Sequence, residues 1–101
     1  MAAESISVMN PATGKLIQEV TVDTPERVES IVNRVRANQP EWEALGFKGR
    51  RDWLNELRDW ILDNSERILD TMQAETGKVR ADASNEPAYL TDLINFYGSR
   101  A

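Results

Sequence analysis

The chain has 101 residues, with 12 basic and 17 acidic side chains, no His and no Cys. This length fits one small domain. Without Cys there is no disulfide, thiolate nucleophile or Cys-based metal site, and without His there is no Ser-His-Asp catalysis or imidazole ligand. The net charge of -5 argues against nucleic-acid binding, which needs a basic surface. We find no membrane span and no secretory signal, and therefore expect a soluble cytoplasmic protein.

A β-hairpin is predicted over residues 6–22. Short runs of β-branched and aliphatic residues, partly alternating with polar ones, lie on either side of residues 10–15. Pro11 presets φ for a turn, and Gly14 can take a positive φ at the bend. Two strands alone are marginal in water, so this hairpin needs a partner surface.

The first helix is expected over residues 24–38, with Thr24 as its cap and Pro25 at its first position. Pro40 predicts that this helix ends just before it, because proline lacks an N–H and crowds the preceding turn. Residues 41–49 carry three large apolar side chains and are expected to form a loop packed on the core. The apolar stripe of the helix follows the i, i+3, i+4, i+7 spacing, at Val28, Ile31, Val32 and Val35.

Two further helices are expected over residues 48–63 and from Ser65, a candidate cap, to Gly77, a left-handed C-cap. A fourth helix is predicted over residues 80–99, where Pro87 either kinks it or marks its start with Asn85 as cap. The inward positions of the second and third helices are Trp53, Leu54, Leu57, Trp60, Ile61, Ile68, Leu69 and Met72.

Isolated motifs do not define an active site. The two Gly-Lys pairs, at residues 14–15 and 77–78, lack the remainder of a phosphate-binding loop, which favours a turn and a helix cap. Residues 46–49 match the G-x-x-G pattern of nucleic-acid clamps, but nearby carboxylates would repel phosphate. Carboxylates four residues apart on the second helix are expected to face solvent. Trp53 and Trp60 favour core packing, with ligand stacking as the alternative.

The order of these motifs resembles the aldehyde dehydrogenase superfamily. The resemblance is carried by the turn at residues 10–15, the helix that begins at Arg50, the Glu-Thr-Gly-Lys sequence at residues 75–78 and the Asn-Phe-Tyr sequence at residues 95–97. It covers residues 6–101. Trp60 and the last two motifs are similar to the succinate-semialdehyde dehydrogenase branch.

This resemblance implies an α/β fold with a Rossmann-like cofactor domain and NAD- or NADP-dependent oxidation of an aldehyde to a carboxylic acid. In the family a cysteine thiolate attacks the carbonyl, hydride passes to nicotinamide, and a glutamate activates water to hydrolyse the thioester. The chain has no Cys, and the family's cofactor motifs lie downstream. We therefore expect residues 1–101 to be an incomplete, N-terminal helical part of the cofactor-binding domain, inactive alone and binding no cofactor alone. The implied partners are the remainder of the dehydrogenase chain, a small aldehyde and further subunits of a homo-oligomer.

The resemblance also implies a monovalent-cation site. Many members use a backbone carbonyl beside the Asn-Pro motif and an acidic residue of the fourth helix, which correspond by spacing to Met9 and Glu86. A hard cation with oxygen ligands suits these groups. The alternative is that Glu86 only favours the positive end of its helix.

A second hypothesis is a free-standing helical interaction module without catalytic activity. Its apolar stripes would then pack on each other or on a partner, as in helix bundles. The fragment hypothesis instead predicts helices with loose packing, because the stripes and the hairpin would lack the sheet that they normally cover.

Overall fold

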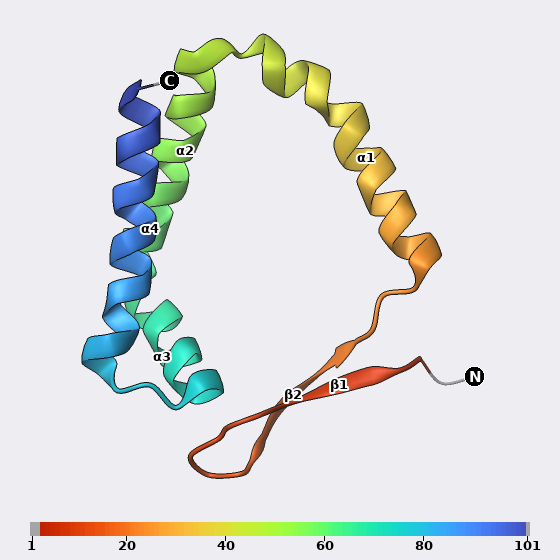
Figure 1. Cartoon of the computed structure of the whole chain (residues 1–101), viewed down its shortest axis with the longest axis vertical. Coiled ribbons are helices and arrows are strands. Elements are labelled where there is room, and N and C mark those ends of the chain that lie inside the picture. The colour runs from red at the N-terminus through yellow and green to blue at the C-terminus, as the bar shows by residue number, and fades with distance from the viewer. Residues whose placement is uncertain (1–2, 101) are drawn as a thin grey trace.

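The computed structural model describes residues 3–100 (Figure 1). A β-hairpin is followed by four helices, which confirms the predicted order of elements. The elements are β1 (Ser5–Met9), β2 (Leu16–Thr21), α1 (Pro25–Ala44), α2 (Gly46–Asp63), α3 (Ser65–Thr76) and α4 (Arg80–Arg100).

The hairpin is antiparallel, with Ser5 opposite Thr21 and a register irregularity at Met9, the last residue of β1. Alternation places the hydroxyls of Ser5 and Ser7 on the same side as Glu19, and they donate to its two carboxylate oxygens at 2.5 and 2.7 Å. Every residue of β2 is exposed. The hairpin is the only sheet among residues 3–100, and it lacks a packed face of its own.

The packed part of the chain is formed by α2, α3 and α4. Its buried residues come from these three helices, whose apolar positions recur at helical spacing. Gly98 lets α4 approach α2 closely, since a Cβ there would lie 3.3 Å from Arg51 Cγ. Arg58 Nη1 then donates to Asn95 Oδ1 at 2.8 Å across the same pair of helices. The buried side chains are Ile61, Leu69, Ala83, Thr91 and Ile94.

α1 arches away from this packed part, and the hairpin then returns so that its turn lies beside the end of α3 (Figure 1). The radius of gyration is 17.7 Å, whereas a compact domain of 100 residues has about 13 Å. The accessible surface is 8072 Å², against about 5,800 Å² for a compact protein of this mass. The loose packing that the fragment hypothesis predicts is therefore present in the structure.

The predicted end of the first helix before Pro40 is wrong. α1 continues through this proline to Ala44, and α2 begins two residues later. Proline removes one helical hydrogen bond and bends a helix, but the following residues are free to resume it. The expected packed loop at residues 41–49 is consequently also wrong: all but Leu45 are helical, and Phe47 is 65% exposed.

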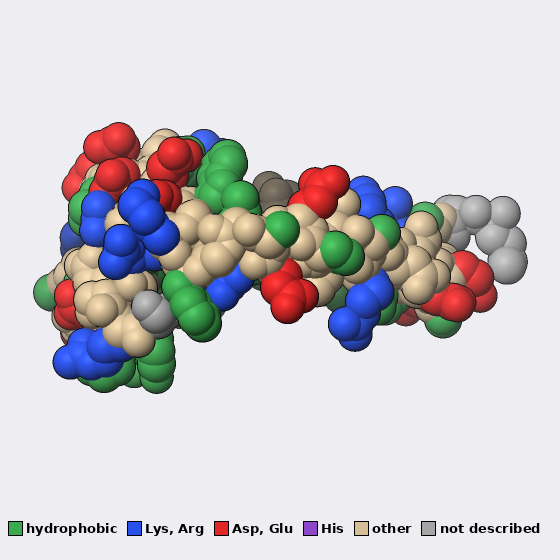
Figure 2. Space-filling model, turned by 90° about the horizontal axis from the view of Figure 1, so that it is seen from above, with side chains coloured by type: hydrophobic (Ala, Val, Ile, Leu, Met, Phe, Trp, Pro, Cys, Tyr) green, Lys and Arg blue, Asp and Glu red, His purple; other side chains and the backbone are tan. Residues whose placement is uncertain are grey.

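The buried stripe predicted for α2 is wrong in three of its five members. Ile61 is buried and Leu54 half-buried, but Trp53, Leu57 and Trp60 are exposed. The physical reason is that α4 covers only one side of α2, and no described element covers the other. Figure 2 shows apolar side chains at the surface between charged ones on the face seen from above.

The alternative that Pro87 marks the start of the last helix is wrong, because α4 runs continuously from Arg80 to Arg100 with Pro87 inside it. Asn85 lies inside α4 and is not its cap. The inward positions of the third helix are as predicted, since Leu69 is buried and Ile68 and Met72 are half-buried. The prediction that Ser65 caps this helix is wrong, because the helix already includes Ser65 as its first residue. Its cap position is taken by Asn64, whose side chain makes no capping hydrogen bond.

Candidate functional site

The turn at residues 10–15 is closed by its own polar groups. Asn10 Oδ1 accepts hydrogen bonds from the backbone N–H groups of Ala12 and Thr13 at 2.9 and 3.1 Å. Gly14, with φ of +68°, donates its N–H to the Asn10 carbonyl at 2.8 Å. Since the side chain of Asn10 mimics a backbone turn, this sequence forms the tip of the hairpin without a ligand. The first Gly-Lys pair is thus a turn, as predicted.

The second Gly-Lys pair ends α3, also as predicted. Gly77 has φ of +72° and donates its N–H to the carbonyl of Gln73 at 3.0 Å. A Cβ on Gly77 would lie 3.2 Å from Pro11 Cγ. The two family-like motifs, far apart in the sequence, therefore meet where the hairpin tip contacts the end of α3.

The proposed cation ligands, Met9 and Glu86, belong to two different elements. Met9 precedes the hairpin turn and pairs with Leu16, while Glu86 lies on α4 and forms an ion pair with the Lys78 ammonium. Among residues 3–100 no group of three or more Asp or Glu side chains is arranged to hold a metal. Because the Glu86 carboxylate already has a positive partner, these residues fit a free monovalent cation poorly. The assignment of Met9 and Glu86 remains a prediction.

Arg80 joins α3 to the first turn of α4. Its guanidinium forms ion pairs with Asp70 at 2.6 Å and with Glu66, and it donates to Gln73 Oε1 at 2.9 Å. The hydrogen bond to Asp70 is the largest cause that raises the pKa of Arg80 above its ordinary value. Sequence reasoning missed this cluster. The sequence feature that could have indicated it is the i, i+4, i+7 spacing of the three acceptors on α3.

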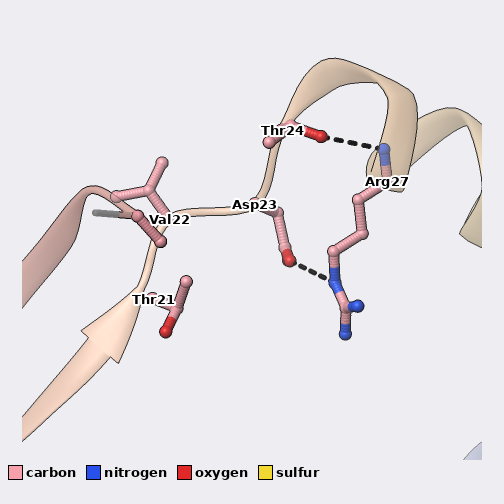
Figure 3. A pocket seen from close by; sticks show the side chains of 6 residues that line it. Thr21, Val22, Asp23, Thr24 and Arg27 are labelled. Atoms are coloured by element: carbon pink, nitrogen blue, oxygen red, sulfur yellow. Dashed lines mark hydrogen bonds and ion pairs between the residues drawn. The ribbon is translucent and has the colours of Figure 1, made fainter. Parts of the chain in front are cut away.

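A hollow of about 550 Å³ lies between the end of β2 and the start of α1 (Figure 3). Two pairs of its polar groups are bonded to each other. Thr24 Oγ1 caps α1 by accepting the Arg27 N–H at 3.2 Å, and Arg27 Nε contacts Asp23 Oδ1 at 2.5 Å. The hollow therefore lies at a capped helix start, and these two interactions account for Asp23, Thr24 and Arg27 in its lining.

The remaining candidates have ordinary roles in the structure. The carboxylate pairs of α2 are exposed as predicted, and Lys48 donates to Asp52 at 2.7 Å, which lowers the pKa of that carboxyl. Trp53 and Trp60 are 57% and 50% exposed, so the preferred prediction of core packing is wrong within this chain. No helix in the described part of the chain has the length and apolar character needed to cross a membrane.

Comparisons with known proteins place this geometry in context. The model of the aldehyde dehydrogenase family matches residues 1–101. A glutarate-semialdehyde dehydrogenase of Pseudomonas aeruginosa is 30% identical over 98 residues, covering 97% of this chain and 20% of that protein. A lactaldehyde dehydrogenase of Escherichia coli is 31% identical over 91 residues, covering 90% of this chain and 19% of that protein.

A Mycobacterium ulcerans protein named as a succinate-semialdehyde dehydrogenase (NADP(+)) is 33% identical over 85 residues, covering 84% of this chain and 16% of that protein. This similarity is consistent with the expected branch. No solved structure matches the chain. The chain spans about a fifth or less of the length of these curated relatives. On the family match over its whole length, the chain belongs to the aldehyde dehydrogenase family.

Proposed function

We propose that residues 1–101 serve as the N-terminal, incomplete part of the cofactor-binding domain of an NAD(P)-dependent aldehyde dehydrogenase. The observation that carries this proposal is the exposed apolar surface of helices that belong to this family. Val28, Val32 and Val35 form an uncovered stripe on α1, and Trp53 and Trp60 lie on an uncovered face of α2. Such surface is normally buried against another layer of the same domain.

The catalytic parts would be supplied by sequence outside these residues. The family reaction needs a thiolate, and the chain contains no Cys. A Rossmann-type cofactor site needs parallel strands with a glycine-rich turn, whereas the sheet of residues 3–100 is an antiparallel hairpin. We therefore propose that these residues alone bind no cofactor and are inactive, and that a Rossmann-like sheet packs against their exposed stripes.

The names of the relatives suggest the substrate class. Two of the three act on semialdehydes by name, and the third on lactaldehyde. We propose a small aldehyde carrying a second polar group as substrate, in a cytoplasmic homo-oligomer. The substrate pocket would be formed largely by the catalytic portion.

The first test is the intact mass of the native gene product in its own cells. A mass several times 11.5 kDa, with NADH or NADPH formation from succinate or glutarate semialdehyde, is expected. The matched control is the 101-residue chain alone, which should produce no reduced cofactor. A native product of 11.5 kDa that purifies without a catalytic partner would overturn the proposal.

The small core of α2, α3 and α4 favours a second candidate, a helical interaction module. Ile61, Leu69 and Ile94 are buried without any further element. Light scattering of the 101-residue chain separates the two candidates. A compact monomer or a defined dimer supports the module, while aggregation through exposed apolar surface supports the dehydrogenase segment.

A further inference from the structure

The loop between α3 and α4 holds Lys78 in a defined place. Gly77 turns the chain in the left-handed conformation and abuts Pro11. The N–H of Lys78 donates to Thr76 Oγ1 at 3.3 Å, and its carbonyl accepts from Gln73 Nε2 at 3.4 Å. Both the N–H and the carbonyl of Lys78 are thus hydrogen-bonded, and these bonds fix the position of its Cα, from which the side chain extends.

The ammonium of Lys78 contacts Glu86 Oε1 on α4. The lysine side chain is 43% exposed and the glutamate side chain 53% exposed, so the pair lies at the surface beside the hairpin contact. One positive and one negative charge meet there. A free cation at Glu86 would have to displace the ammonium or place two cations on one carboxylate, which Coulomb repulsion disfavours.

We propose that the ammonium of Lys78 binds the Glu86 carboxylate in place of a free cation. The chain therefore binds no free sodium or potassium ion at Glu86. The covalently attached ammonium loses no translational freedom when it binds, unlike a free ion. The pair links the end of α3 to α4 at the point where the hairpin tip docks. Occupation of Glu86 by this ammonium does not depend on aldehyde oxidation.

The test is NMR of the 101-residue chain with choline chloride replaced by NaCl or KCl at constant ionic strength. We expect no saturable shift of the backbone amides of Met9 and Glu86 in either salt. Saturable shifts that Glu86→Gln abolishes would show a bound free cation and would overturn the proposal. The expected result, no saturable shift, is measured on the unaltered chain and does not depend on the folding of a variant.

The pair itself is tested through the side-chain ammonium signal of Lys78. Glu86→Gln should shift this signal and speed its hydrogen exchange, because the carboxylate that holds it is gone. The matched control is Asp52→Asn, which removes the partner of Lys48 in another exposed ion pair. It should change the Lys48 signal and leave Lys78 unaltered. A Lys78 signal that does not respond to Glu86→Gln contradicts the proposal.

Discussion

Gly77→Ala tests whether the hairpin tip and the end of α3 are physically joined. Gly77 has φ of +72°, and an L-residue in this conformation costs about 1–2 kcal/mol. The new Cβ would also lie 3.2 Å from Pro11 Cγ, so the proline ring must move. Such crowding costs up to about 3 kcal/mol in a packed core, and at this exposed contact we expect about 1 kcal/mol. The total loss is then about 2–3 kcal/mol.

Gly46→Ala is the matched control. Gly46 has φ of +67°, and a Cβ there would meet no atom within 4 Å. Its substitution should therefore cost only the conformational 1–2 kcal/mol, roughly as for any residue forced into this region. The difference between the two variants isolates the contact with Pro11.

Urea unfolding followed by circular dichroism gives the free energies, and amide hydrogen exchange in the last turn of α3 gives the local effect. A Pro11→Ala background should relieve the crowding, so that Gly77→Ala there costs the same as Gly46→Ala. Equal losses for Gly77→Ala and Gly46→Ala in the unaltered background would refute the contact between the two motifs.

Three further changes test other parts of the structure. Pro40→Ala should stabilise α1 by up to about 3 kcal/mol, because it restores a helical hydrogen bond, and unchanged amide exchange after residue 36 would contradict this. The Ser5 and Ser7 hydroxyls hold the pKa of Glu19 below its ordinary value of 4.5. Their stabilisation of the hairpin is therefore present above pH 4.5 and lost as the pH falls through the folded pKa. In an acid titration followed by NMR, the stability of the hairpin should depend less on pH for Glu19→Gln than for the unaltered chain. Arg80→Lys keeps the charge but loses the two-pronged guanidinium that can bond several acceptors. The backbone amides of α3 should therefore exchange hydrogen faster in the variant, and the difference from the unaltered chain should be smaller at high salt. Equal exchange rates in both proteins would argue against the Arg80 cluster.

Local signals correctly predicted the hairpin turn, the cap of α1 and the end of α3. Gly14, Thr24 and Gly77 act through atoms within a few residues, and each has the expected role. These positions depend on backbone geometry and on side chains that bond their own neighbours, and both are encoded in short sequences. The contact of Pro11 with Gly77 joins distant segments, and no local pattern predicted it.

At Pro40 the rule that proline ends a helix fails because of the residues that follow it. The rule states a cost for proline in a helix, but whether the helix ends or bends depends on the residues after the proline. The next four residues continue the helix to Ala44, so the chain tolerates one missing hydrogen bond. Sequence reasoning had no means to weigh that cost against the alternative loop.

The exposed tryptophans carry a more general argument about partner surfaces. The spacing of Trp53, Leu57 and Trp60 correctly indicates an apolar face of the helix. Such a pattern predicts that the face needs to be buried, but it does not identify the surface that buries it. The accessible surface of 8072 Å² exceeds the compact value by about 2,300 Å², whereas a standard protein interface takes about 800 Å² from each partner. The uncovered area is thus larger than one such interface. Exposed large apolar side chains lie on the hairpin, α1, α2 and α4, which argues for the packing of a whole layer of a domain and against docking of a single peptide.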